Sequence, residues 1–201
     1  LDIKIDGIPS HAGVAPEQGV SAIAIASLAI ASLHDEGWHG LVKKGSKRGT
    51  SNIGVINSGA ATNVVAERAT IRAEARGHDP GFRNKIVRAI EKAFDKAAQN
   101  VRSASGHRGT VSITKRLDYE AFRIPQTDLS VVTAHKALES IGYKPYYDVS
   151  NGGLDANWMA ANGIPTVTLG CGQHDIHTTN EWLDLTAYKA ACRVALMLAT
   201  S

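Results

Sequence analysis

The sequence is poor in cysteine and contains no long apolar run. Its 201 residues include only two cysteines, which excludes the disulfide framework of a small secreted domain and favours a reducing cytoplasm. No uninterrupted apolar stretch approaches the roughly 18 residues that a membrane-spanning helix needs, and no signal peptide is recognisable, so we expect no contact with a membrane. The first residue is Leu1 and not Met, and we expect the chain to be an interior part of a longer protein.

The charge and several absent motifs exclude other classes of protein. The formal net charge is only +3, and the basic residues are scattered, which argues against a nucleic acid partner. The basic cluster from Lys43 to Arg48 lies in a Gly-containing turn and is interpreted as a solvated loop. The sequence lacks the Gly-x-Ser-x-Gly motif of serine hydrolases and the Gly-x-Gly-x-x-Gly motif of nucleotide-binding folds. It also has no His-x-Asp motif and no adjacent pair of glutamates, so the ligands of a complete two-metal site are missing.

The pattern of residues 1–117 predicts one α+β domain. Apolar residues alternate with polar ones in the clearest strand, and Asp79-Pro80 is a typical helix start, with the Asp as cap and the Pro in the first turn. The predicted elements, in order, are a strand at 1–6, a helix at 16–33, strands at 51–56 and 69–76, a helix at 79–103 and a strand at 110–116. This βαββαβ order is that of a ferredoxin-like sandwich, in which the first and last strands are neighbours. A domain whose ends lie so close together is suited to insertion into another domain.

From residue 118 to residue 201 the pattern changes to alternating helices and strands. The predicted elements are helices at 128–141, at 154–161 and from 184 onwards, with strands at 146–149 and 165–169. This alternation is typical of the C-terminal part of a parallel α/β sheet. Because two short strands do not form a stable sheet alone, we expect partner strands before residue 1.

Three polar residues of the first domain are candidates for function, and each has an alternative structural explanation. His11 lies in a Gly-rich loop, either as a surface residue or as a hydrogen-bond donor at a mobile edge. Asn63 is most simply a turn residue. Arg76 lies on the free face of its strand, where it is either solvated or forms a fork that binds a carboxylate.

The second domain adds two further candidates. Gly152 and Gly153 occupy a strand-to-helix junction, which either caps the helix or presents backbone N–H groups to an anion. His177 follows the predicted strand 165–169. It is either a loop histidine without a special role or one ligand of a metal ion. A zinc site made of His174 and His177 alone would lack further ligands.

Taken together, these segments resemble a known family. The motifs that carry the resemblance follow one another along nearly the whole chain: Gly7-x-x-Ser-His11-Ala-Gly13-x-x-Pro16-Glu-x-Gly19, Ser51-Asn-Ile-Gly-Val-Ile56, Ala61-Thr62-Asn63-Val-Val, Glu74-Ala-Arg76-x-His-Asp79, Gly152-Gly-x-Asp155-Ala-Asn157 and His177-Thr-Thr-x-Glu181. The set resembles the co-catalytic zinc exopeptidases of the aminoacylase and carboxypeptidase type, most closely the peptidase T-like tripeptidase branch. The sequence departs from that pattern at Asn57-Ser-Gly, where a Gly pair is common, and at Ala66, where Pro is usual.

The resemblance implies an architecture and a set of roles. Residues 1–117 would be a ferredoxin-like lid that mediates dimerisation, and residues 118–201 the C-terminal part of the α/β catalytic domain. His177 would be the last protein ligand of one of two zinc ions. His11 would enter the active site of the partner subunit and donate a hydrogen bond to the developing oxyanion. The remaining matched residues would contact the substrate: Asn63 and Arg76 at its carboxylate end, Gly152 and Gly153 along the cleft.

The resemblance also implies a function. The chain would be a fragment of a cytoplasmic, homodimeric zinc exopeptidase that hydrolyses small peptides through a metal-activated water. With one metal ligand only, it would be inactive by itself. Two alternatives stay open: a noncatalytic dimerisation or binding module, and an amidohydrolase acting on N-acyl or N-carbamoyl amino acids.

Overall fold

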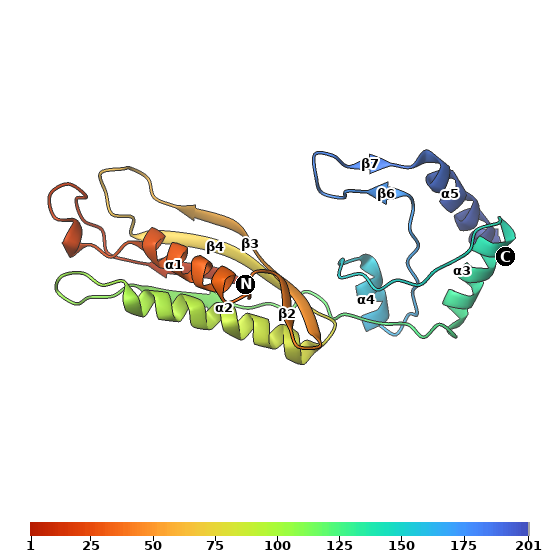
Figure 1. Ribbon diagram of the computed structural model, residues 1–201, viewed down its shortest axis with the longest axis horizontal. Coiled ribbons are helices and arrows are strands. Elements are labelled where there is room, and N and C mark those ends of the chain that lie inside the picture. Colours follow the sequence, from red (N-terminus) through yellow and green to blue (C-terminus); the bar gives the residue numbers. More distant parts are fainter. Residues whose placement is uncertain (201) are drawn as a thin grey trace. The chain divides into compact units, whose positions relative to one another are not determined.

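The computed structural model describes residues 1–200 and consists of two compact units, Leu1–Asp118 and Tyr119–Ser201. The first unit contains a sheet and two long helices, and the second contains three helices and a short strand pair (Figure 1). Each unit is described by itself.

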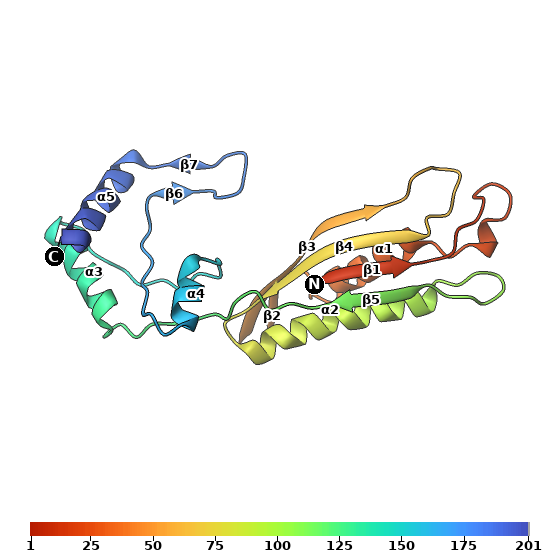
Figure 2. The same cartoon turned by 180° about the vertical axis from the view of Figure 1, so that it is seen from behind.

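The first unit is built on a five-stranded antiparallel sheet. Its strands follow the order β2-β3-β4-β1-β5, so that β1 lies between β4 and β5 (Figure 2). The strands are β1 (Asp2–Asp6), β2 (Gly40–Lys44), β3 (Lys47–Ser58), β4 (Arg68–Arg76) and β5 (Thr110–Thr114). The pairing of β1 with both β4 and β5 brings the first and last predicted strands together, as the sequence pattern indicated.

The sheet buries one face against α1 (Ala22–Asp35) and α2 (Pro80–Asn100). Ile3, Ile5 and Ile71 are at most 2% exposed and form a core with residues of both helices, whereas the alternate positions of β1 and β4 face solvent. Burial of these large side chains drives the packing of helices on sheet. Charged residues occupy the open face, which therefore remains available for polar contacts.

Two predictions for the first unit need correction. The helix predicted at 16–33 is interrupted: a 3₁₀ turn spans Pro16–Gln18, Val20 bridges to Ile8, and Ser21 caps α1 by accepting a hydrogen bond from the N–H of Ala24 (3.1 Å). The basic cluster is not a plain loop, since its residues form the ends of the hairpin of β2 and β3. Sequence reasoning missed β2 because a short strand at a sheet edge, with most side chains exposed, has little apolar alternation.

The start of α2 was predicted correctly. Asp79 accepts a hydrogen bond from the backbone N–H of Phe82 (3.1 Å), and Pro80 is the first helical residue. Lys47, at the start of β3, forms an ion pair with the same carboxylate. The hydrogen bond from Lys47, followed by that from Phe82, lowers the pKa of Asp79 below its ordinary value.

The second unit has its two strands at other positions than the sequence pattern predicted. Its helices are α3 (Leu129–Ser140), α4 (Asp155–Ala161) and α5 (Leu185–Thr200), and its strands are β6 (Gln173–His174) and β7 (Trp182–Leu183). Segments 146–149 and 165–169 are not strands, so this part of the fold prediction was wrong for the described residues. The physical reason is that neither segment pairs with a neighbouring strand within residues 1–200, and an unpaired strand leaves its backbone hydrogen bonds unmade. No helix among the described residues is long and apolar enough to span a membrane.

Candidate functional site

His11 and Asn63 lie together at one end of the first unit. His11 forms an antiparallel bridge with Val64, and the backbone N–H of Ala12 donates to the carbonyl of Asn63 (2.9 Å). Both segments are loops, the first following β1 and the second joining β3 to β4, and Figure 1 shows them at the same end of the sheet. The side chains of His11 and Asn63 are exposed. The structure therefore brings together two of the predicted site residues.

The imidazole of His11 has a defined hydrogen-bonding state. Its Nδ1 accepts a hydrogen bond from the backbone N–H of Gly13 (3.1 Å). A ring nitrogen that accepts must carry the lone pair, so in the neutral ring the proton resides on Nε2. His11 therefore presents an N–H donor from an exposed loop.

Arg76 lies at the opposite end of the sheet from His11 and Asn63. It is the last residue of β4, whose nine residues span roughly 26 Å. Its guanidinium forms a bidentate ion pair with Glu74, with Nε to Oε1 at 3.1 Å and Nη2 to Oε2 at 2.8 Å. The two side chains share the open face of the sheet, and that of Arg76 is 37% exposed. A carboxylate ligand would join this pair or displace Glu74.

Gly152 and Gly153 precede α4. A Cβ at Gly153 would overlap the phenol of Tyr119, and the ring of Tyr119 packs edge-on against Trp158. Close packing on Tyr119 is thus a sufficient reason for glycine at position 153. The N–H of Gly152 donates to the hydroxyl of Ser150 (3.0 Å), so this N–H is engaged within the turn.

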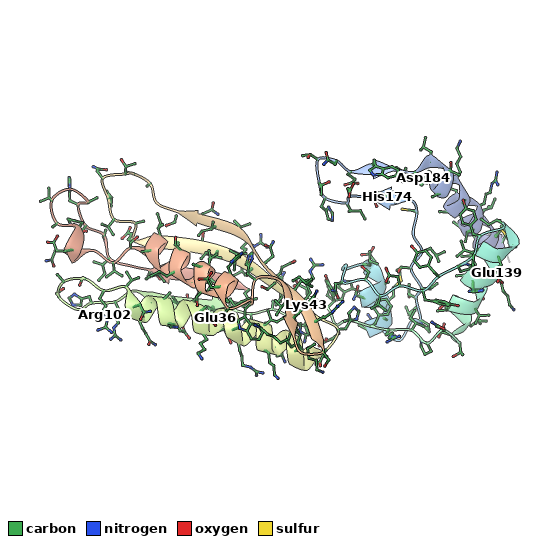
Figure 3. The ribbon with its side chains drawn as sticks, in the orientation of Figure 1. Glu36, Lys43, Arg102, Glu139, His174 and Asp184 are labelled. Atoms are coloured by element: carbon green, nitrogen blue, oxygen red, sulfur yellow. The ribbon has the colours of Figure 1, made fainter. Side chains whose placement is uncertain are left out.

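His177 occupies the turn of the hairpin formed by β6 and β7. Its φ of 66° is in the left-handed region, as is that of Asp175 at 51°, and these are the non-glycine residues with positive φ among residues 1–200. Such backbone is disfavoured for residues with a side chain and is concentrated at functional sites. Within the described chain no hydrogen bond engages the His177 ring, which is exposed. His174, labelled in Figure 3, instead stacks on Trp182 with ring centroids 4.1 Å apart.

Glu181 stabilises this hairpin turn through two hydrogen bonds. Its Oε1 accepts a hydrogen bond from the amide of Gln173 (2.7 Å), and its Oε2 accepts one from the backbone N–H of His177 (3.1 Å). The bond from Gln173, followed by that from His177, lowers the pKa of the Glu181 carboxyl below its ordinary value. The sequence placed Glu181 in the motif that begins at His177 but assigned it no role.

The residues present fit one coordination position and not a complete metal site. Among residues 1–200 no group of three or more His, Cys, Asp or Glu side chains could hold a metal ion. The exposed imidazole of His177 is suited to be a single ligand. Cys171 and Cys192 are both free thiols at the surface.

Comparisons with known proteins identify relatives of this chain. Residues 1–102 match the family of the peptidase dimerisation domain. The uncharacterized protein YqjE of Bacillus subtilis is 38% identical over 177 residues, which is 88% of this chain and 44% of that protein.

Two solved structures are similar over nearly the whole chain. Aminopeptidase PepT from Bacillus cereus shares 37% identity with a TM-score of 0.73, over 98% of this chain and 49% of that one. A tripeptidase from Staphylococcus aureus shares 32% identity with a TM-score of 0.77, over 97% of this chain and 48% of that one. The chain thus spans about half the length of the relatives that it matches.

Proposed function

Because this chain belongs to the M20 peptidase family, in its peptidase T-like branch, we propose that it is the substrate-recognition part of a zinc-dependent exopeptidase that hydrolyses small peptides. In this proposal residues of the first unit bind the substrate and stabilise charge, and His177 of the second unit contributes one metal ligand. The remaining ligands would come from outside the chain. A bound metal ion would supply the activated water and polarise the scissile carbonyl.

The observation that carries the proposal is the hydrogen bond from the N–H of Gly13 to Nδ1 of His11. Since Gly13 donates to Nδ1, the exposed Nε2 holds a proton that it can donate. A fixed N–H donor is what the developing oxyanion of a peptide carbonyl requires during hydrolysis. In this proposal His11 stabilises the developing charge by donating a hydrogen bond.

Arg76 is assigned to the free carboxylate at the C-terminus of the peptide. A guanidinium binds a carboxylate through two parallel hydrogen bonds, which gives geometric selectivity for a chain end. This selectivity would make the enzyme an exopeptidase. Asn63 would supply amide hydrogen bonds from the same end of the unit as His11.

The separation of His11 from Arg76 favours a site shared between two subunits. Arg76 ends β4, whose nine residues span roughly 26 Å, and His11 and Asn63 lie at the other end of the sheet, so one protomer cannot bring all three to a small peptide. In a homodimer, His11 and Asn63 of one protomer would meet Arg76 of the other. The oxyanion contact and the carboxylate contact would then come from different chains.

The edge of β3 is the part of the first unit where we place the dimer contact. We classify β1, α1, β3, β4, α2 and β5 as a ferredoxin-like sandwich to which β2 is added. Because β2 pairs only with residues 47–51 of β3, the edge from Asn52 to Ser58 has no neighbouring strand on that side among the described residues, although the N–H of Ile53 donates to Nε2 of His39 (3.4 Å). Ile56 of this edge is 48% exposed, and Ile23 of α1 is 45% exposed. An unpaired edge beside apolar side chains is suited to pairing with a second copy.

The proposal is tested on the protein purified with its natural ends. We would measure zinc affinity by chelator competition and hydrolysis of a tripeptide, its C-terminal amide and an N-acyl amino acid, for the wild type, His177→Ala and His174→Phe. The proposal expects hydrolysis of the free tripeptide to exceed that of the other two substrates. It expects His177→Ala to lose zinc affinity and activity, and His174→Phe, which preserves the stack on Trp182, to retain both.

Equal zinc affinity and activity in the wild type and His177→Ala would remove the ligand assignment. Preferred hydrolysis of the N-acyl amino acid would support the amidohydrolase alternative. Dimers without hydrolysis of any of the three substrates would support a noncatalytic module.

A further inference from the structure

We infer that Glu181 is a positioning residue for His177: its carboxylate holds the His177 backbone in the left-handed conformation that presents the imidazole. The inference rests on the proposed role of His177 as a metal ligand. It adds a residue to which neither the sequence motifs nor the relatives give a role.

The hairpin around His177 is held at its base by pairing and stacking. Gln173 and His174 of β6 pair with Leu183 and Trp182 of β7, and the rings of His174 and Trp182 are nearly parallel, with an interplanar angle of 10°. The strands are only two residues long, so this base is short. The turn that carries His177 therefore depends on further contacts for a fixed shape.

Two of these contacts are local to the turn. The hydroxyl of Thr178 donates to the carbonyl of Asp175 (2.7 Å), and the N–H of Asn180 donates to the Thr178 hydroxyl (3.2 Å). Together with the bond from the N–H of Thr178 to the carbonyl of Asp175 (3.1 Å), they close the turn around His177. They do not use the N–H of His177, which is bonded by another group.

Glu181 provides that contact. It receives the backbone N–H of His177 on Oε2 and the side-chain amide of Gln173 on Oε1, so one carboxylate joins the turn to strand β6. The bond to His177 uses the backbone and leaves both ring nitrogens available. Because both carboxylate oxygens accept hydrogen bonds from protein donors, Glu181 is placed to support the turn.

The left-handed backbone of His177 depends on this hydrogen bond from its N–H to Glu181. With φ of 66°, a residue that bears a side chain relaxes to right-handed or extended conformations unless its surroundings fix it. A change of φ at His177 would move the imidazole away from its present direction. Outer groups that orient a ligand typically change metal affinity by about 10- to 100-fold when they are removed.

The test compares Glu181→Ala, Glu181→Gln, Gln173→Ala and His177→Ala with the wild type, in the protein with its natural ends. Two quantities are measured: zinc affinity by chelator competition, and hydrogen exchange of the His177 backbone amide by NMR. We expect Glu181→Ala to weaken zinc binding by about 10- to 100-fold and to speed exchange of the His177 amide. Glu181→Gln retains an acceptor oxygen. It should therefore bind zinc more tightly than Glu181→Ala and show slower exchange of the His177 amide. Gln173→Ala keeps the bond between Glu181 and His177 and should lie closer to the wild type than Glu181→Ala does.

The outcomes separate this inference from the proposed function. If His177→Ala weakens zinc binding while Glu181→Ala leaves both zinc affinity and amide exchange unchanged, the positioning role is wrong and the ligand assignment stands. If His177→Ala leaves zinc affinity unchanged, the ligand assignment fails. Amide exchange in Glu181→Ala still decides whether the carboxylate holds the turn. Far-ultraviolet circular dichroism checks that each variant is folded. The conservative variant Glu181→Gln further separates loss of the His177 position from global unfolding.

Discussion

The backbone nitrogen of Gly13 lies 3.1 Å from Nδ1 of His11, in the loop where His11 bridges to Val64. This contact determines which ring nitrogen accepts and which one donates, and thereby directs a donor outward. It links a three-residue feature of the sequence, His11-Ala-Gly13, to the role that we propose for the side chain in hydrolysis.

Replacement of His11 by alanine should reduce kcat by about 10²- to 10³-fold with a smaller effect on KM, as expected for loss of an oxyanion donor. Gly13→Pro removes the N–H that bonds Nδ1, and Gly13→Ala retains it. A Cβ at Gly13 would lie 3.7 Å from His11 Cε1, an ordinary contact. We therefore expect Gly13→Ala to stay near the wild type, and Gly13→Pro to lower kcat and to change the tautomer observed in the ¹⁵N spectrum of the imidazole. A wild-type kcat for His11→Ala would contradict the assignment.

Arg76→Lys should raise KM for a tripeptide with a free C-terminus by roughly 10- to 100-fold, because an ammonium cannot form the bidentate pair and charged hydrogen bonds contribute about 1.5–3 kcal/mol. The matched control is Arg72→Lys, four residues earlier on the same open face, where the guanidinium pairs with Asp2 at 3.6 Å. Steady-state kinetics with the free peptide and its C-terminal amide give the measurement. The two variants should differ only with the free peptide, and equal losses in both would point to a general electrostatic effect.

Asp79 should contribute to stability above acidic pH. Its folded-state pKa is lowered, first by the hydrogen bond from Lys47 and then by the N–H of Phe82. A group with a lowered pKa stabilises the fold above its unfolded pKa, and this contribution is lost as the pH falls through the folded pKa. Urea midpoints measured between about pH 2 and pH 7 should therefore fall less steeply with acid for Asp79→Asn than for the wild type. Parallel curves for the two proteins would show that the interaction does not stabilise the fold.

Ile56→Arg should weaken self-association through the free edge of β3. The Kd of the dimer should rise by roughly tenfold or more, because a charge left unpaired in a buried interface costs above about 1.4 kcal/mol. Leu28→Arg is the control, since Leu28 is similarly exposed, at 51%, but lies on a different side of α1 from Ile23. Sedimentation velocity over a range of concentrations measures both. An Ile56→Arg protein that stays as dimeric as the wild type would place the contact elsewhere.

Local sequence signals predicted the first unit well because the features that define its helices and strands lie within each element. The alternation in β4 and the cap at Asp79 act within a few residues, and both were found from sequence. The interruption before Ser21 was missed because the bridge between Val20 and Ile8 is a tertiary contact with no local signature. The hairpin with β2 was missed for a related reason, since an exposed edge strand lacks a buried face.

The second unit shows where sequence patterns are insufficient. Segments 146–149 and 165–169 have the composition of buried strands, but a strand forms only beside a partner, and residues 1–200 offer them none. At the candidate site, the motifs located His11, Asn63 and His177 but could not indicate that Arg76 lies a strand length from the first two. Nor could they show the bond between Glu181 and the His177 backbone, which depends on a left-handed turn.

Gly153 provides a test of whether a residue matched by motif acts through packing. The overlap of an added Cβ with the Tyr119 phenol predicts that Gly153→Ala lowers stability by about 1–3 kcal/mol, as overpacking generally does. Tyr119→Ala removes the obstructing ring, so the double variant should be less destabilised than the sum of the two single changes. Urea unfolding of the four proteins gives this coupling, and activity is measured in parallel. Additive stabilities with a loss of activity in Gly153→Ala alone would instead assign the glycine to substrate contact.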